Sequence, residues 1–215
     1  MSDGKSVVPE TVVNIFSYVV EHDNGEAPNP YFDFCTLCRC KFREKAEDAR
    51  GRKLPRNIVE LAKVGDWVIG TGGASKKRSV GRHGTLVYAM RVDEKPTRKD
   101  YFSDSRFAEK KRVDAGTYEQ TRGDNERPRN DFERVEQFAL VSQHFYYFGA
   151  SAKSATNIPK RFKFLEKTGP GFRYVDPENF RPFREWLEKH YELGKQGEPC
   201  YQELPKGAKR CKSSC

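Results

Sequence analysis

The pattern of apolar and polar residues divides the chain into several segments with strand character. Residues 12–20 are rich in β-branched and aromatic side chains, and residues 67–69 and 138–148 share this composition. In residues 85–92 the largest apolar side chains fall at every second position, which is the period of a strand. A glycine-rich basic loop joins residues 67–69 to residues 85–92, so these strands are predicted to form a long hairpin or to be neighbours in a barrel.

Two other segments carry helical signals. Residues 97–110 are predicted to form a helix with Thr97 as its N-cap. The last helix is predicted to run from about residue 177 to 193, with Asp176 as N-cap and Gly194 at its end. The helical spacing of four apolar residues predicts its buried stripe: Phe180, Phe183, Leu187 and Tyr191.

Strands and helices do not alternate regularly along the chain, so a parallel sheet of repeated strand–helix–strand units is not expected. The pattern predicts an α+β fold with a curled, mostly antiparallel sheet, or a small β-barrel, and flanking helices. Residues 1–194 are predicted to form a single domain. Residues 39–56 form a basic insertion, partly helical over 43–49, and residues 195–215 form a flexible basic tail that contains cysteines.

The chain is basic, with a net charge of +9 over its 215 residues. Because the basic residues are clustered, a polyanionic partner such as nucleic acid or a nucleotide is predicted. The chain has no apolar run of membrane-spanning length, and its first ten residues lack the apolar core of a signal peptide. A cytoplasmic protein without membrane contact is therefore predicted, with its cysteines mostly reduced.

Short strings of residues, in order along the chain, are similar to a known family. The first comprises Tyr18-Val19-Val20, Asp23, Gly25, Ala27-Pro28-Asn29-Pro30, Cys35-Thr36-Leu37 and Cys40-Lys41. The second comprises Val64-Gly65-Asp66-Trp67-Val68-Ile69-Gly70-Thr71-Gly72, Gly84 and Leu86-Val87-Tyr88-Ala89-Met90-Arg91-Val92. On these strings and weaker ones up to about residue 195, the chain resembles the nucleotide modification associated domain family of the second type. The resemblance implies a role alongside DNA or nucleotide modification in bacteria and phages, including anti-phage defence.

A second resemblance concerns the fold alone. The pattern consists of Val64-Gly65-Asp66, then a strand, a glycine and a second strand that leaves toward a helix. This pattern is similar to barrels of the PUA, EVE and YTH kind. Those barrels hold modified bases or RNA in an aromatic-lined pocket. This resemblance implies a PUA/EVE-like barrel, but a fold by itself does not establish a function.

The segment Gly70-Thr71-Gly72-Gly73, followed by Ser75-Lys76-Lys77-Arg78, is predicted to be a loop. Glycine lets backbone N–H groups approach an anion, and hydroxyl and ammonium groups add donors, so this loop is a candidate for phosphate contact. It lacks the Gly-Lys-Ser/Thr ending of a P-loop. The alternative is a flexible hairpin loop with a solvated run of charge.

Basic residues also cluster at Arg106, Lys110, Lys111 and Arg112, and again at Lys160, Arg161 and Lys163. The last group is interleaved with Phe162 and Phe164, which suits backbone neutralisation combined with base stacking. The alternative is that both phenylalanines face a core while the charges face water.

A histidine in the strand segment 138–148 is a further candidate. On one continuous strand, Ser142, His144 and Tyr146 would share a face, and that face could line a pocket that reads a base edge. The alternative is a hydrogen-bonded structural histidine. Asp124 and Asn125 could contact a ribose, a metal or a base, or could only form a turn.

Cys35, Cys38 and Cys40 lie close together, but no second pair of cysteines or histidines completes a four-ligand zinc site. No metal and no cofactor are therefore predicted. Cys35 is predicted to be buried, with the thiols of Cys38 and Cys40 at the surface. As an alternative, Cys35 is a nucleophile whose pKa is lowered by neighbouring basic residues.

These observations favour recognition of a nucleic acid or nucleotide, including one with a modified base. The alternatives are an enzyme of nucleotide modification with Asp124, Cys35 and His144 in one cleft, and a protein that regulates a DNA-modification enzyme. The candidate binding residues are Asn29, Thr36, Thr71, Gly72, Lys76, Lys77, Lys110, Lys111, Asp124, Asn125, His144 and Tyr146.

Overall fold

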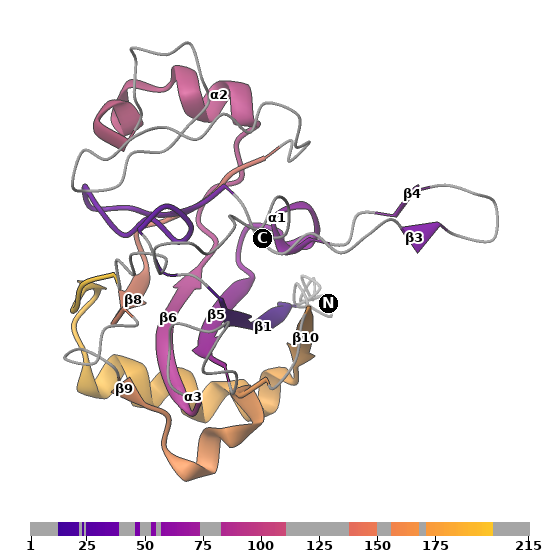
Figure 1. The fold of residues 1–215 in the computed structure, drawn as a ribbon, viewed down its shortest axis with the longest axis vertical. Coiled ribbons are helices and arrows are strands. Elements are labelled where there is room, and N and C mark those ends of the chain that lie inside the picture. Colours follow the sequence, from indigo (N-terminus) through magenta and orange to yellow (C-terminus); the bar gives the residue numbers. More distant parts are fainter. Residues whose placement is uncertain are drawn as a thin grey trace, which may run out of the picture.

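A 7-stranded sheet forms the centre of the molecule (Figure 1). The computed structural model describes residues 13–21, 23, 25–38, 57–73, 83–110, 138–149, 156–167 and 171–199, and the backbone of 46–47 and 53–54. The strands are β1 (Ile15–Val20), β5 (Trp67–Gly72), β6 (Thr85–Arg91), β8 (Phe145–Tyr147), β9 (Thr156–Asn157), β10 (Phe172–Val175) and β11 (Gly194–Lys195). Their order is β10-β1-β5-β6-β8-β11, with β9 beside β6.

The sheet is mostly antiparallel, as predicted, and only the pairs β1–β5 and β8–β11 are parallel. Within the described part of the chain it stays open, because β10 and β11 at its two ends each pair with one neighbour. The first strand uses both edges, for β5 and β10, and so cannot return to β8 to close a ring. The barrel of the PUA or EVE kind is therefore not formed by the described strands.

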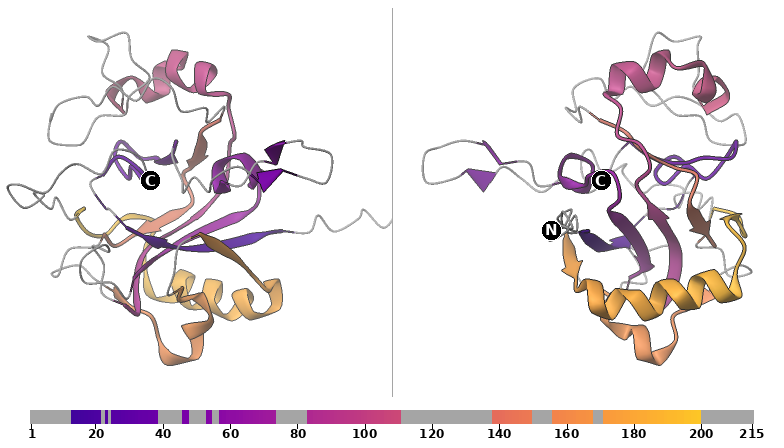
Figure 2. Two further views of the ribbon diagram at one scale, coloured as in Figure 1. Left: turned by 45° about the vertical axis from the view of Figure 1, so that its right-hand side comes forward. Right: turned by 180° about the vertical axis from the view of Figure 1, so that it is seen from behind.

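One face of the sheet is covered by the helices α3 (Pro177–His190) and η2 (Lys160–Leu165) (Figure 2). The predicted N-cap of α3 is confirmed, since Asp176 Oδ1 accepts a hydrogen bond of 2.8 Å from the Glu178 N–H. The predicted stripe is buried at Phe180, Phe183 and Leu187, but the helix ends at His190 rather than near 193, so Tyr191 is its C-cap and Gly194 lies in β11. After the helix, β11 adds to the sheet, and the Gln196 N–H donates to the Tyr147 carbonyl at 2.7 Å.

A smaller layer covers the opposite face. It contains the two-stranded sheet of β2 (Cys35–Leu37) and β7 (Leu140–Ser142) and the short helix α1 (Ile58–Leu61). Beyond it lie α2 (Arg98–Ser103) and η1 (Ser105–Lys110), at the top of Figure 1. Thr97 caps α2 as predicted, because its Oγ1 accepts from the Asp100 N–H at 3.1 Å. The single helix predicted over 97–110 is broken at Asp104.

Three further predictions of local structure are wrong. The segment Ala46–Glu47 is β3 and pairs with β4 (Lys53–Leu54), so the helix predicted over 43–49 is not formed there. The predicted strand 138–148 is two strands, β7 and β8, separated by Gln143 and His144. The predicted loop at Gly70 to Gly72 is part of the buried strand β5. None of the described helices is long and apolar enough to span a membrane.

Candidate functional site

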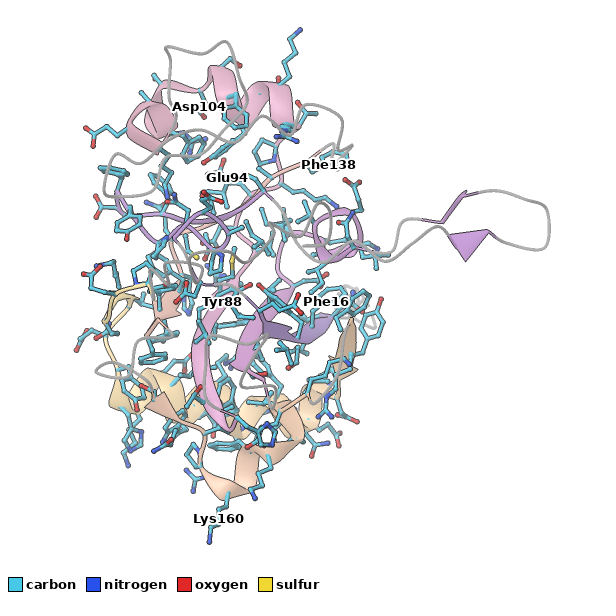
Figure 3. The ribbon with its side chains drawn as sticks, in the orientation of Figure 1. Phe16, Tyr88, Glu94, Asp104, Phe138 and Lys160 are labelled. Carbon is cyan, nitrogen blue, oxygen red and sulfur yellow. The ribbon has the colours of Figure 1, made fainter. Side chains whose placement is uncertain are left out.

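Buried polar side chains gather around the β2–β7 sheet, some in the core shared with the central sheet and others, such as Asn29 with Lys110, on the side of η1. We call this group the inter-sheet cluster, and it comprises Asp23, Asn29, Cys35, Lys110, Ser142 and Tyr147. Each of these residues is at most 1% exposed. The surrounding core contains residues of both sheets, such as Tyr88 and Leu37 (Figure 3 labels Tyr88). Buried polar groups are costly unless they are paired, so this concentration of them needs a specific reason.

Lys110 supplies the positive charge of the inter-sheet cluster from the end of η1. Its Nζ donates to the Asn29 Oδ1 at 2.8 Å, to the Asn29 carbonyl at 3.1 Å and to the Phe34 carbonyl at 2.7 Å. Three acceptors match the three N–H groups of an ammonium. Burial disfavours the charged form of this ammonium and is the dominant influence, so it lowers the pKa of Lys110 to about 7.

A comparison within the chain shows that a lysine is not required at this position for packing. The helices η1 and η2 both contain an Arg-Phe pair with the same backbone kink, at Phe107 (φ −107°, ψ 16°) and Phe162 (φ −107°, ψ 17°). Three residues later each helix has a fully buried side chain, Lys110 in η1 and Leu165 in η2. An apolar residue satisfies this geometry in η2, so the lysine in η1 reflects the polar surroundings into which it points.

Asp23 and Tyr147 form the second pair of the inter-sheet cluster. The Tyr147 hydroxyl donates to Asp23 Oδ1 at 2.5 Å, across 124 residues of sequence. Burial and the neighbouring Asp23 carboxylate raise the pKa of Tyr147 well above its usual value. Cys35 lies within the electrostatic influence of both Asp23 and Lys110, and burial raises its pKa to about 12. The thiol is therefore protonated at neutral pH, which argues against a nucleophilic Cys35.

Ser142 is the one member of the inter-sheet cluster whose buried hydroxyl has no hydrogen-bond partner among the described residues. It lies directly opposite Cys35 in the antiparallel β2–β7 pair. Opposite residues in such a pair point to the same face, and Cys35 belongs to the core between the two sheets. The Ser142 Oγ is therefore directed into the inter-sheet cluster. An unsatisfied buried hydroxyl is unfavourable, by about 1–3 kcal/mol, so it calls for a specific explanation such as a bound water, ion or ligand.

Two tyrosine rings pack in the same core as Cys35 and Tyr147. The hydroxyls of Tyr18 and Tyr88 are hydrogen-bonded at 2.8 Å, and their ring centroids are 6.1 Å apart. Tyr88 lies over Gly70, where an added Cβ would come within 2.3 Å of the ring. Aromatic rings beside hydrogen-bonding groups can hold a flat heteroaromatic ligand by stacking and read its edge.

The lowered pKa of Lys110 predicts a specific dependence of stability on pH. Between pH 7 and 10.5 the unfolded chain binds more protons at this residue than the folded chain, so stability rises with pH. Cys35 has the opposite effect on stability, but only above pH 9.0, which is the pKa of its thiol in the unfolded chain. From pH 7 to 9 we expect the free energy of unfolding to rise by up to about 2–3 kcal/mol, relative to Lys110→Met. Urea denaturation of both proteins measures this, and parallel pH profiles would contradict it.

The predicted site residues separate into four groups. Asn29, Thr36 and Lys110 are brought together: Asn29 and Thr36 exchange two backbone hydrogen bonds of 2.9 Å, and Lys110 binds Asn29. Thr71 and Gly72 are buried in β5, and the Thr71 hydroxyl donates to the Tyr18 carbonyl at 3.2 Å. The third group lies outside the described residues: Lys76, Lys77, Lys111, Asp124 and Asn125.

His144 and Tyr146 lie on the other face of the central sheet. The His144 ring packs edge-on against Trp67, with centroids 5.4 Å apart, and at 6.1 Å from Tyr146. Trp67 and Tyr146 belong to the core beneath α3. Burial, followed by the nearby Arg91, lowers the pKa of His144 and favours the neutral ring. The predicted common face with Ser142 does not form, because the strand breaks at residues 143–144.

The central sheet also separates Cys35 from His144, two of the residues that the enzyme hypothesis places in one cleft. Cys35 lies on the β2–β7 side and His144 on the α3 side. They therefore do not converge in one cleft, and Asp124 lies outside the described residues. The thiol of Cys38 is buried, contrary to the prediction of a surface thiol. Among the described residues, no three His, Cys, Asp or Glu side chains are arranged to hold a metal ion.

The basic clusters also differ in their surroundings. Arg106 is held by ion pairs of 2.8 Å to Glu94 and 2.7 Å to Asp104. In η2, Phe162 is buried while Lys160 and Arg161 are exposed, as the alternative interpretation of this segment predicted.

Sequence reasoning missed the pairing of Asp23 with Tyr147 and the isolated Ser142 hydroxyl. The signal for Tyr147 was present, because strand alternation places Phe145 and Tyr147 on the face opposite Tyr146. No sequence pattern identifies Asp23 as the partner, since their contact depends on the order of the strands.

Comparison with known proteins adds one finding. The family model described as nucleotide modification associated domain 2 matches residues 12–136 and 126–206. No curated protein and no solved structure matches the chain significantly.

Proposed function

Since the chain belongs to the nucleotide modification associated domain 2 family, we propose that it recognises a nucleotide or an unpaired nucleobase, including a modified one, through the inter-sheet cluster. The family description supports a role linked to nucleotide modification. The proposed setting is DNA modification or anti-phage defence, alongside a DNA-modification enzyme.

The unsatisfied Ser142 hydroxyl carries this proposal. It is fully buried, directed toward Cys35, and lies in the same core as Tyr147 and Tyr88. A nucleobase offers donors and acceptors along its edge and a flat face for stacking, so it could satisfy Ser142 while contacting the tyrosine rings. The Asp23 carboxylate adds acceptors suited to the N–H groups of a base.

The inter-sheet cluster is closed to solvent in this structure, since its members are at most 1% exposed. Entry of a base therefore requires the β2–β7 layer to move relative to the central sheet. Such a movement would also exclude water from the bound base, which strengthens each hydrogen bond to it.

Ser142→Ala is the most direct test. Because this change removes an unsatisfied buried hydroxyl, we expect it to raise the free energy of unfolding by about 1 kcal/mol. We also expect it to weaken nucleotide binding by about tenfold, because the hydroxyl would be paired only in the complex. Urea denaturation measures the first effect. Calorimetric titration with nucleoside monophosphates, and mass spectrometry of nucleotides released from the purified protein, measure the second.

Ser17→Ala provides a matched control. Ser17 is also fully buried, but its hydroxyl donates to the Leu165 carbonyl at 2.5 Å on the α3 side of the sheet. This variant should lose about 1 kcal/mol of stability and keep its affinity. If Ser142→Ala behaves like Ser17→Ala in both measurements, the Ser142 hydroxyl serves packing and the proposed site is wrong. A wild-type protein that releases and binds no nucleotide would contradict the function itself.

A further inference from the structure

The turn between Asn29 and β2 has an unusual backbone. Its two central residues, Phe32 (φ 55°) and Asp33 (φ 61°), both adopt positive φ. The Phe34 N–H donates to the Tyr31 carbonyl at 3.3 Å and closes the turn. Turns with positive φ at both central positions favour Asn-Gly or similar pairs, because a side chain such as phenylalanine is strained there. The sequence therefore places a bulky aromatic residue where glycine or asparagine would fit better.

The surrounding structure keeps this turn from relaxing. Lys110 Nζ binds the carbonyls of Asn29 and Phe34, which lie on either side of the turn. The backbone bridge between Asn29 and Thr36 fixes the base of the same segment. The turn is thus anchored by the buried lysine of the inter-sheet cluster. Backbone strain that is held in this way is typical of functional positions.

Packing does little to compensate for the backbone strain at Phe32, because Phe32 is 43% exposed. Its ring lies against Tyr31, with centroids 6.3 Å apart at 53°. The Lys195 ammonium lies 5.3 Å from the centroid of the Tyr31 ring. A single exposed phenylalanine is ordinary on a protein surface, but one held at positive φ by a buried lysine is not. The arrangement holds the backbone of Phe32 in this conformation and leaves the residue exposed to solvent.

We infer that Phe32 is a stacking platform for a nucleobase next to the one held in the inter-sheet cluster, so that the ligand is a single-stranded oligonucleotide rather than a mononucleotide. The inference rests on the proposed function. Phe32 is three residues from Cys35, a span of at most ~11 Å, so a short strand could contact both the turn and the inter-sheet cluster. Stacking on aromatic side chains is the common means by which proteins hold unpaired bases.

Three variants separate the aromatic ring from the shape of the turn. Phe32→Gly removes the ring and relieves the strain. Asp33→Gly relieves strain at the neighbouring position and keeps the ring, and Phe32→Tyr keeps an aromatic face. Fluorescence anisotropy with a labelled single-stranded DNA oligomer and with the same oligomer as a duplex, and calorimetry with nucleoside monophosphates, measure binding. Thermal unfolding midpoints measure stability.

We expect the wild type to bind the single strand more tightly than the duplex or a mononucleotide. Phe32→Gly should weaken binding of the single strand by about tenfold or more and leave mononucleotide binding unchanged. Asp33→Gly and Phe32→Tyr should bind the single strand within about threefold of the wild type. Neither glycine variant should have a lower unfolding midpoint, because each removes a strained residue.

Three results would overturn the inference while the proposed function stands. The first is that the wild type and Phe32→Gly bind the single strand equally well. The second is that Asp33→Gly loses as much affinity for the single strand as Phe32→Gly, and the third is that Phe32→Gly loses mononucleotide binding. A fall in the unfolding midpoint of Phe32→Gly would show a packing role and would overturn it as well. If the wild type binds none of the three ligands, both the inference and the proposed function are wrong.

Discussion

Replacing Gly70 by alanine is expected to lower the free energy of unfolding by about 3 kcal/mol or more. An added Cβ would lie 2.3 Å from Tyr88 Cε1 and 2.6 Å from Val20 Cγ2, in the fully buried centre of the sheet. Neither side chain has free space, because Tyr88 is also hydrogen-bonded to Tyr18. The Tyr88 ring must move, which disturbs the core that it shares with Cys35 and Tyr147. Urea denaturation of the variant measures the loss.

Gly65→Ala is the control for this prediction. Gly65 has a positive φ of 94°, but no atom of the described residues beyond its chain neighbours lies within 4 Å of the position of an added Cβ. We expect its replacement to cost about 1 kcal/mol through backbone strain alone. Equal losses of stability in Gly70→Ala and Gly65→Ala would indicate that the close approach of Tyr88 to Gly70 does not limit the residue at this position. Nucleotide binding should be weakened in Gly70→Ala and unchanged in Gly65→Ala.

The second large effect is expected for Lys110→Met, which should lower the free energy of unfolding by about 3 kcal/mol at pH 8. Methionine has a similar length but cannot donate, so the carbonyls of Asn29 and Phe34 lose their buried donor. The loss should be smaller at pH 6, where the wild type bears the full cost of burying an ammonium. Denaturation at both pH values tests this.

Lys99→Met supplies the control, since Lys99 is exposed on α2, close to Lys110 in the chain. Its effect on stability should be within about 0.5 kcal/mol. If Lys110→Met is as stable as Lys99→Met, the buried lysine does not hold the turn at Phe32. The turn itself can be followed by proteolysis, which should cleave near Phe32 in Lys110→Met more readily than in the wild type.

The elements that were correctly predicted are those with strong local signals. The alternation in residues 85–92 identified β6, and the helical spacing of Phe180, Phe183 and Leu187 identified the buried face of α3. Predictions were wrong where local sequence is ambiguous. Gly70 to Gly72 resembles a loop, yet forms a strand because it pairs with β1 and β6, and Gly70 leaves the space that Tyr88 and Val20 occupy.

The candidate site was only partly accessible to sequence reasoning. Asn29, Thr36 and Lys110 were identified, and the structure brings them together. Ser142, His144 and Tyr146 were expected to share one strand face, but His144 and Tyr146 lie across the central sheet from Ser142, because one strand ends at Ser142 and the next begins at Phe145. Side-chain direction depends on strand breaks of this kind, which a continuous apolar pattern conceals.

The amino-acid sequence by itself determined the family, the main strands, the caps at Thr97 and Asp176, and the basic character of the chain. The strands and the caps depend on interactions between residues that are near one another in the chain, and the family and the charge are properties of the sequence itself. Only the tertiary structure decided that Asp23 meets Tyr147, that Ser142 faces Cys35, and that Lys110 anchors the strained turn at Phe32. Each of these contacts joins residues far apart in sequence, and its geometry is fixed by the order in which the strands pair.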